Sequence, residues 1–228
     1  MVRGDDLLIA ALVPGRCLHC RGPARSPDPL CGSCRAALPW LPVDGCPRCA
    51  LPLRCAPGRC PAERAAFAAA WAPLGYDGPA RTLAWAHKER ATRRLARWLA
   101  AAMVVRGPVG WLTNVTVVVP VPADPVRRHR RGTDHAGGLA AAVAVRLGRP
   151  VRAALERPRG RGPAAAQHRL SRRERGRLSP PALVTPVRGT VLLVDDVHTT
   201  GATLHGAARA LRDGGATRVL ALTAFRAE

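Results

Sequence analysis

The sequence of 228 residues contains almost no lysine: Lys88 is the only one, although arginine brings the formal net charge to +21. Aromatic residues make up only 4% of the chain, so a core drawn from its hydrophobic 47% must rely on Ala, Val and Leu. Arginine enrichment with little lysine is typical of a GC-rich genome. It also suits a polyanionic partner, either a nucleic acid or a substrate that carries pyrophosphate. Composition alone is compatible with both explanations.

The chain also lacks a long hydrophobic run. A membrane-spanning helix needs roughly 18 consecutive apolar residues, and the apolar run at residues 7–13 is much shorter. That run follows Asp5 and Asp6 rather than a basic segment, and no small-residue cleavage site comes after it. A secretory signal peptide has a basic segment before its apolar run and a small-residue cleavage site after it. We therefore expect no membrane span, no signal peptide and a cytoplasmic protein.

Cysteine is absent after residue 60, since all eight cysteines lie between Cys17 and Cys60. In a cytoplasmic protein such clustering favours metal binding over disulfides. Three pairs have Cys-x-x-Cys spacing, and four thiolates per tetrahedral ion predict two structural zinc sites without an open position for catalysis. The simplest assignment is sequential, with Cys17, Cys20, Cys31 and Cys34 on one ion and Cys46, Cys49, Cys55 and Cys60 on the other. The spacing leaves an interleaved assignment open.

Two parts of the chain differ in pattern. Residues 1–61 are rich in Pro and Gly, and such a short polar segment cannot bury enough surface to fold unaided. We expect a zinc-binding module here, followed by one α/β domain at residues 62–228. Residues 62–110 look like a connection into a helix whose apolar face is formed by Leu95, Trp98, Leu99, Ala102 and Met103.

From residue 111 onward, strands and helices are expected to alternate. The pattern predicts buried strands at 115–119, 191–194 and 218–225, helices at 134–147 and 202–212, and a short strand near 183–185. Short, fully apolar strands separated by helices indicate a parallel sheet that is covered on both faces. The fold class is therefore α/β, with the cysteine-rich module in front of it.

The most informative segment follows the strand at 191–194. Asp195 and Asp196 come first, and then Thr199, Thr200, Gly201, Ala202 and Thr203 lead into a helix. Ligands of open α/β sheets bind beyond the carboxyl ends of the strands, and a helix N-terminus suits a phosphate. The two carboxylates would repel a phosphate but suit ribose hydroxyls and Mg²⁺. The segment therefore predicts a site for a ribose 5-phosphate. The Walker pattern of nucleotide-binding loops is absent.

Residues 191–204 resemble the signature of type I phosphoribosyltransferases. Together with the cysteine-rich N-terminus, the chain resembles the ComF family of competence-related proteins from Cys17 to Phe225. The resemblance implies a type I phosphoribosyltransferase-like sheet that binds phosphoribosyl pyrophosphate, or a 5-phosphoribosyl nucleotide, with Mg²⁺. Asp195 and Asp196 would then be the catalytic residues that hold the ribose hydroxyls, and residues 199–203 would hold the 5-phosphate.

Two further segments fit this resemblance. Residues 119–122 resemble the pyrophosphate loop, so that Val121, and Arg127 and Arg131 after it, would contact the pyrophosphate. Guanidinium groups bind phosphate oxygens in pairs, although these arginines could also form a solvated face. Lys88, the second residue of a His-Lys pair before a predicted helix, resembles a lysine of the family and is expected to contact a substrate phosphate.

The chain departs from the family on the acceptor side of the site. Residues 131–135 read Arg-Gly-Thr-Asp-His where relatives commonly have Arg-Gly-Phe-Asn-Gln, and residues 167–171 keep only a Gln and a basic pattern. The departure concerns the acceptor reaction more than the binding of a phosphoribosyl group. His198 lies within the main loop. We expect it to face solvent or a neighbouring loop rather than to act as a general base.

Two main functions remain open, and a third possibility is that catalysis has been lost while phosphoribosyl pyrophosphate is still bound for regulation. The first is transfer of a phosphoribosyl group to an acceptor that the sequence does not identify. The second is a nucleic-acid-binding accessory protein of DNA uptake, with single-stranded DNA or competence-machinery proteins as partners, that uses the pocket for regulation or not at all. The basic residues 157–177 could close over a substrate or follow a nucleic-acid backbone. They contain no aromatic residue on which bases could stack.

Overall fold

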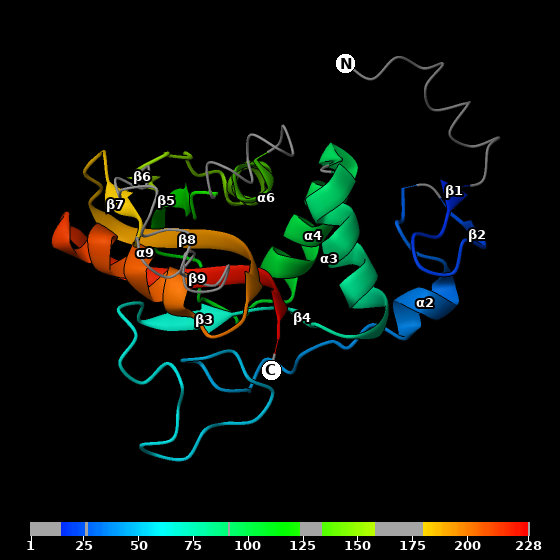
Figure 1. The fold of residues 1–228 in the computed structure, drawn as a ribbon, viewed down its shortest axis with the longest axis horizontal. Helices are drawn as coiled ribbons and strands as arrows, with labels where there is room; N and C mark the ends of the chain where they lie inside the picture. Colours follow the sequence, from blue (N-terminus) through cyan, green and yellow to red (C-terminus); the bar gives the residue numbers. More distant parts are fainter. Residues whose placement is uncertain (1–14, 26, 91, 124–133, 158–179, 228) are drawn as a thin grey trace, which may run out of the picture.

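The computed structural model describes residues 15–25, 27–90, 92–123, 134–157 and 180–227. Its centre is a parallel sheet in the order β3 (Ala69–Trp71), β9 (Ala216–Arg226), β8 (Gly189–His198) and β5 (Val115–Pro120) (Figure 1). A short strand, β4 (Leu74–Gly75), pairs with β9 beyond β3. The predicted α/β class with a parallel sheet is therefore confirmed.

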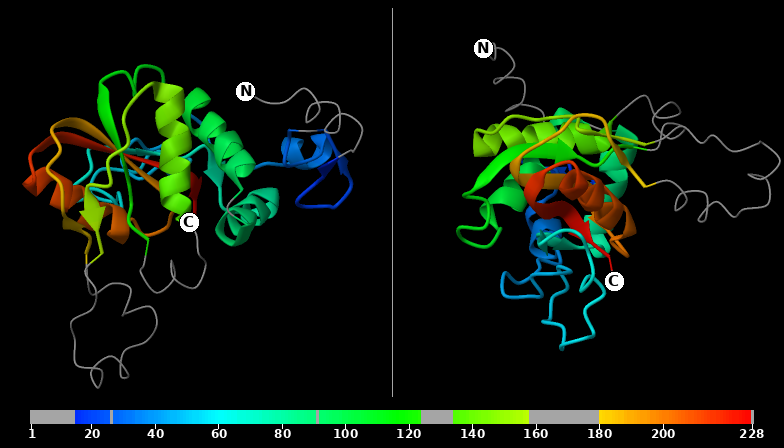
Figure 2. Two further views of the ribbon diagram at one scale, coloured as in Figure 1. Left: turned by 90° about the horizontal axis from the view of Figure 1, so that it is seen from above. Right: turned by 90° about the vertical axis from the view of Figure 1, so that its left-hand side faces the viewer.

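Helices cover both faces of the sheet. One face carries α3 (Gly78–Arg90), α4 (Arg93–Val105) and α6 (His135–Leu147), and the other carries α9 (Ala202–Asp213). Figure 2 shows α6 and α9 on opposite sides of the strands. Successive strand residues point to opposite faces, so Leu192 and Val194 pack under the first three helices while Val191 and Leu193 pack under α9.

Local signals set where the helices begin and end. Thr92 accepts a hydrogen bond from the Leu95 N–H at the start of α4, and Asp134 accepts one from the Gly137 N–H at the start of α6. Such side-chain caps satisfy amide groups that lack a partner within the helix. Gly148 ends α6 in the left-handed conformation with φ 60°, where glycine is favoured.

Short elements surround this core. The first cysteine pairs lie around a two-stranded antiparallel ribbon of β1 (Gly15–Arg16) and β2 (Pro23–Ala24), which precedes α2 (Gly32–Ala36). A second ribbon joins β6 (Leu155–Glu156) to β7 (Ala182–Leu183). Among the described residues, no helix combines the length and the hydropathy that crossing a membrane would require.

The structure differs from the sequence predictions in three places. Residues 62–110 contain β3, β4 and α3 in addition to the predicted helix, because β9 offers these residues a pairing edge that no local pattern reveals. The strand predicted at 191–194 continues to His198, since its pairing with β9 extends to Arg226. The strand near 183–185 belongs to the separate β6–β7 ribbon rather than to the main sheet.

Candidate functional site

The two acidic residues lie where β8 approaches its carboxyl end. Asp195 is opposite Thr223 of β9, and its Oδ1 accepts a hydrogen bond of 2.8 Å from the backbone N–H of Asp196. Enclosure of the Asp195 carboxyl group raises its pKa to about 8, and the neighbouring charge of Asp196 acts in the same direction. Lys88 and Arg157 partly oppose this rise. Among the described residues, the positive charge near Asp195 therefore does not offset the effect of its burial.

Lys88 reaches this acidic pair from α3. Its Nζ lies 3.4 Å from Oδ2 of Asp196, and both side chains are largely buried, with 32% and 18% of their surface exposed. The structure thus brings the single lysine of the chain to the predicted site across more than a hundred residues of sequence. Its contact with a substrate phosphate stays a prediction.

The turn after β8 has the shape that the sequence suggested. Gly201 has φ +76° and is the residue before α9. Thr199, Thr200 and Ala202 are exposed, and Gly201 and Thr203 are half-buried. Within the described part of the chain no side chain caps α9 at Gly201, although Oγ1 of Thr200 accepts a hydrogen bond of 3.4 Å from the Ala202 N–H. A turn with an accessible helix N-terminus is suited to an anion.

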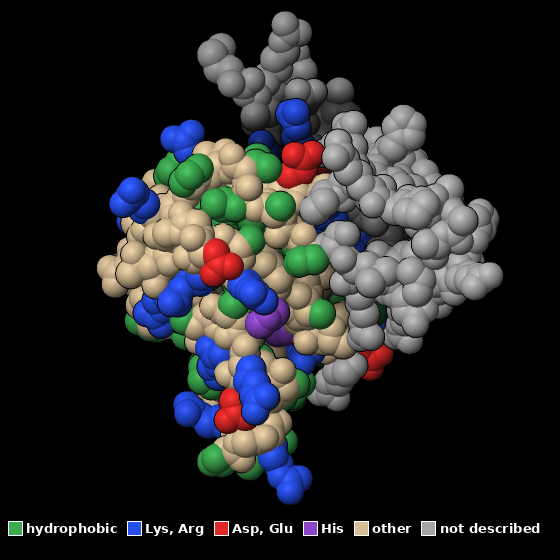
Figure 3. All heavy atoms as spheres, turned by 60° about the vertical axis from the view of Figure 1, so that its left-hand side comes forward, with side chains coloured by type: hydrophobic (Ala, Val, Ile, Leu, Met, Phe, Trp, Pro, Cys, Tyr) green, Lys and Arg blue, Asp and Glu red, His purple; other side chains and the backbone are tan. Residues whose placement is uncertain are grey.

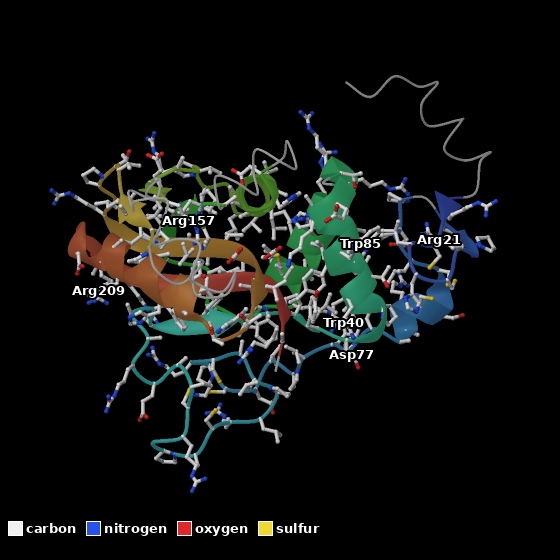
Figure 4. The ribbon with its side chains drawn as sticks, viewed as in Figure 1. Arg21, Trp40, Asp77, Trp85, Arg157 and Arg209 are labelled. Atoms are coloured by element: carbon white, nitrogen blue, oxygen red, sulfur yellow. The ribbon has the colours of Figure 1, made fainter. Side chains whose placement is uncertain are left out.

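The segment after β5 lies directly beside the end of β8. The Val121 N–H donates a hydrogen bond of 2.8 Å to the carbonyl of Val194, next to Asp195. The side chain of Arg157 donates from Nε to the carbonyl of Pro122, at 3.1 Å. Figure 4 shows Arg157 near β8. Arg127 and Arg131, predicted for the same loop, lie outside the described residues.

Arg157 was not singled out by the sequence analysis. It begins the basic stretch at 157–177, in which no arginine differs from the others by its pattern. Arg157 is set apart only by its position in the fold. It directly follows β6, which ends at Glu156, and this places its side chain within hydrogen-bond distance of the Pro122 carbonyl. The charge of Arg157 favours the ionised form of Asp195.

Of the two surroundings predicted for His198, solvent is wrong and a neighbouring loop is right, since the ring packs against the irregular segment before β3. Its side chain is buried, with 2% exposed, and packs edge-on against Phe67 with ring centroids 6.1 Å apart. Burial, followed by the charge of Arg226, lowers the pKa of His198 to about 4, so the ring is neutral at pH 7. A Cβ atom at Gly201 would lie 2.8 Å from His198 Nε2. The imidazole of His198 therefore packs directly against the backbone of the turn at Gly201.

Arg226, the last residue of β9, connects this turn to the second cysteine cluster. Its side chain is buried and donates to the carbonyls of Cys49 at 2.7 Å, Thr199 at 2.8 Å and His198 at 3.1 Å. The sequence analysis missed this residue. The one signal in the sequence was its position directly after the strand predicted at 218–225. A cation that is buried there requires hydrogen-bond partners.

The cysteines form two clusters of four. The Sγ atoms within each cluster lie within 4.8 Å of one another, and the sets are Cys17, Cys20, Cys31 and Cys34, and Cys46, Cys49, Cys55 and Cys60. Bonds of 2.3 Å from a tetrahedral zinc ion place its sulfur ligands about 3.8 Å apart. Three pairs lie close to this value, at 3.6 Å for Cys20 and Cys31 in the first cluster, and at 3.5 Å for Cys49 and Cys55 and 3.8 Å for Cys46 and Cys60 in the second. Both clusters fit zinc, with the sequential grouping predicted as the simplest.

The chemistry of the thiols also favours a cation. Burial opposes ionisation of Cys17, but backbone hydrogen bonds, that of Cys31 foremost, lower its pKa to about 6. Burial and the neighbouring thiols raise the pKa of Cys34 to about 12. The second cluster repeats the pattern, with a pKa of about 6 for Cys46 and a raised pKa for Cys49. Four thiolates in one cluster therefore require a bound cation to balance their charge.

The segments that carry the two clusters lie apart, the first beside α3 and the second beside β3 (Figure 1). Cys17 and Cys34 join the core formed with α3, α4 and α6, and Nδ1 of His19 lies 2.9 Å from Oγ1 of Thr82 in α3. Cys46 and Cys49 join the core on the side of α9. Only the second cluster is therefore linked through Arg226 to the turn after β8.

Arg48 fixes the second cluster to the sheet. It lies between Cys46 and Cys49 and donates hydrogen bonds to five carbonyls in the segment before β3, those of Ala62, Glu63, Ala65, Phe67 and Ala68. The carbonyl of Pro47 also accepts a hydrogen bond of 2.8 Å from the Ala70 N–H in β3. The second cluster is thus held both to β3 and, by Arg226, to the turn.

Comparisons with known proteins give fold similarity only. No protein-family model and no curated protein matches the chain, so the resemblance to the ComF family stays a prediction. Phosphoribosylpyrophosphate synthetase from Mycobacterium smegmatis is similar with 22% identity and a TM-score of 0.34, over 58% of this chain and 33% of the synthetase. Orotate phosphoribosyltransferase from Aeropyrum pernix has 19% identity and a TM-score of 0.34, over 64% of this chain and 76% of that one. The chain thus spans about a third of the synthetase.

Proposed function

We propose that the chain binds phosphoribosyl pyrophosphate at the carboxyl end of β8 and transfers the phosphoribosyl group to a nucleophilic acceptor. The observation that carries this proposal is an acidic pair that is followed closely by a turn into a helix N-terminus. Asp195 and Asp196 directly follow the four buried residues 191–194 of β8, and within five residues the chain reaches Gly201, which precedes α9. A 5-phosphorylated ribose likewise carries hydroxyls and a phosphate on one small molecule.

Each part of the ligand has a candidate partner. The carboxylates of Asp195 and Asp196 would accept hydrogen bonds from the ribose hydroxyls, and residues 199–203 would hold the 5-phosphate. Residues 119–122, with Arg127 and Arg131, would hold the pyrophosphate. Arg157 and Lys88 add positive charge beside them.

Asp195 and Asp196 also supply the hard oxygen ligands that Mg²⁺ prefers. When bound, Mg²⁺ would neutralise charge on the pyrophosphate and make it a better leaving group. Because the pKa of Asp195 is about 8, this carboxyl group must give up a proton before it can bind a cation well. Lys88 and Arg157 favour that ionisation by their charge.

The proposed reaction requires no protein nucleophile. A lone pair on the acceptor forms a bond to the anomeric carbon, and the bond from that carbon to pyrophosphate breaks, with its electron pair leaving on the pyrophosphate oxygen. A proton on the attacking atom passes to solvent. The chain contributes by positioning both reactants and by stabilising the charge of the leaving group.

Isothermal titration with phosphoribosyl pyrophosphate and Mg²⁺ tests the binding step. We expect wild-type protein to bind and the Asp195→Asn/Asp196→Asn variant to lose at least about tenfold in affinity, as for lost hydrogen bonds to charged groups. Asp213→Asn is the matched control, because this carboxylate at the end of α9 is 72% exposed. Absence of binding by wild-type protein would rule out the proposal. Pyrophosphate release over a panel of bases and amines then identifies the acceptor.

A nucleic-acid-binding role in DNA uptake is the second candidate, and the charge of +21 favours it. On the face shown in Figure 3, basic side chains prevail over acidic ones. Filter binding of single- and double-stranded DNA over a salt series tests this role, since phosphate contacts weaken steeply with salt. Failure to retain either DNA at low salt would exclude it.

We also propose that residues 1–61 act as a structural module with two zinc ions in a cytoplasmic protein. The grouping of thiols at zinc-compatible distances supports this assignment. Metal analysis of protein purified without added metal should find about two zinc ions per chain, one for each four-thiolate site.

A further inference from the structure

A cavity of about 630 Å³ lies between α4 and α6, beside the carboxyl end of α3. It is on the face of the sheet opposite α9. Its polar lining consists of His87, Arg93, Arg97, Asp134, His135 and Arg146. Sites for small molecules commonly have volumes of about 300–1,000 Å³ and few polar groups. The cavity therefore has the size of a site for a small ligand.

His87 indicates that this cavity is a binding site. Its side chain is 1% exposed and lines the cavity, yet among the residues that the structure describes its ring nitrogens have no side-chain hydrogen-bond partner and interact only with the backbone of His135. Burial lowers the pKa of His87, so its ring is neutral and offers one donor and one acceptor. Buried polar atoms are nearly always paired with protein or with another molecule. A ligand would supply that pairing.

The remaining walls define the chemistry of the ligand. Arg93 and Arg97 from α4 and Arg146 from α6 place three cations around the cavity. The carboxylate of Asp134 already accepts a hydrogen bond of 2.9 Å from Gly137, as the cap of α6. Between the cations the lining is small and apolar, with Ala96, Gly138, Ala141, Ala142 and Val145. Such walls suit a flat apolar body that carries a negative group, because arginine binds carboxylates in pairs of hydrogen bonds.

We propose that this cavity binds a small aromatic carboxylate, with the acid group held by the arginines and the ring against the small residues of α6. The cavity adjoins the acidic pair on β8, because the charge of Asp196 acts on His87 and the two sites are neighbours along α3. His87 lines the cavity, and the next residue, Lys88, forms the ion pair with Asp196. The inference concerns binding and does not depend on the transfer reaction.

Two fluorescent probes of equal shape test the proposal. 2-Aminobenzoate carries a carboxylate, and 2-aminobenzamide is its neutral counterpart. Fluorescence titration of the full chain, without phosphoribosyl pyrophosphate, should give saturable binding of the benzoate and at least about tenfold weaker binding of the amide, the factor expected from one charge-assisted contact. Lack of saturation by the benzoate, or equal affinity for the two probes, would overturn the proposal.

Substitutions then locate the site. Arg97→Gln should weaken binding of 2-aminobenzoate about tenfold without unfolding the protein, because Arg97 is exposed. Arg209→Gln is the control, since this arginine is 73% exposed on α9, away from the cavity (Figure 4). Equal affinities of the two variants would place the probe elsewhere and refute the assignment. His87→Gln should also weaken binding, and a circular dichroism melt establishes that each variant is folded.

Discussion

The connection made by Arg226 gives the sharpest prediction for stability. Arg226→Met keeps the length of the side chain but removes the donors to Cys49, His198 and Thr199, which lie between 2.7 and 3.1 Å away. Hydrogen bonds to a charged group contribute about 1.5–3 kcal/mol each, and neighbouring bonds are not additive. We therefore expect the free energy of unfolding to fall by about 3–5 kcal/mol, measured from urea denaturation.

The same substitution should affect two distant properties. The turn that begins at Thr199 loses a support, so affinity for phosphoribosyl pyrophosphate should fall, and the second cluster should release zinc to a chelator faster than the first. Arg226→Lys should recover part of the stability, because an ammonium group can still donate to these carbonyls. Arg209→Met, at an exposed site on α9, should change stability by no more than about 0.5 kcal/mol. A change equally small for Arg226→Met would refute the reasoning.

Three further predictions concern the site and the metal clusters. At pH 7 a group with a pKa of about 8 is mostly protonated, so binding of phosphoribosyl pyrophosphate with Mg²⁺ to ionised Asp195 should release roughly 0.9 proton and strengthen as the pH rises toward 8. Binding enthalpies that are equal in PIPES and Tris buffers would contradict this. Gly201→Ala should cost about 1–2 kcal/mol for its positive φ and more for the contact with His198. Gly58 has a similar φ of +74° but has no atom near its Cβ position. In urea denaturation Gly58→Ala should therefore show only the cost of the positive φ. Cys49→Ser should lower the zinc content by one ion and reduce the melting temperature, whereas unchanged metal content would exclude Cys49 as a ligand.

The local sequence pattern was sufficient to predict the strand and the turn that carry the candidate site. Four consecutive apolar residues at 191–194 predicted β8, and the Thr-Thr-Gly sequence after the acids predicted the turn into α9. Cys-x-x-Cys spacing likewise predicted the first thiol pairs of both clusters. These features depend on interactions between residues close in sequence, and such interactions leave a readable pattern.

The residues that pack around these elements could not be predicted from local sequence patterns. β3 and β4 are only a few residues long and exist because β9 offers them an edge. His198 was expected to face solvent or a neighbouring loop, because a polar residue in a loop is usually exposed. Its burial depends on Phe67, which arrives from a segment far away in the chain.

By itself, the sequence determined the α/β class, the acidic pair with its turn, and the thiols available for two metal ions. Only the tertiary structure decided which residues surround them. It placed Lys88 against Asp196, Arg157 beside the Pro122 carbonyl, and Arg226 between the second cluster and the turn. The physical reason is that an ion pair or a buried hydrogen bond requires only proximity in space. The pairing of strands and the packing of helices create that proximity, and they are set by the whole chain at once.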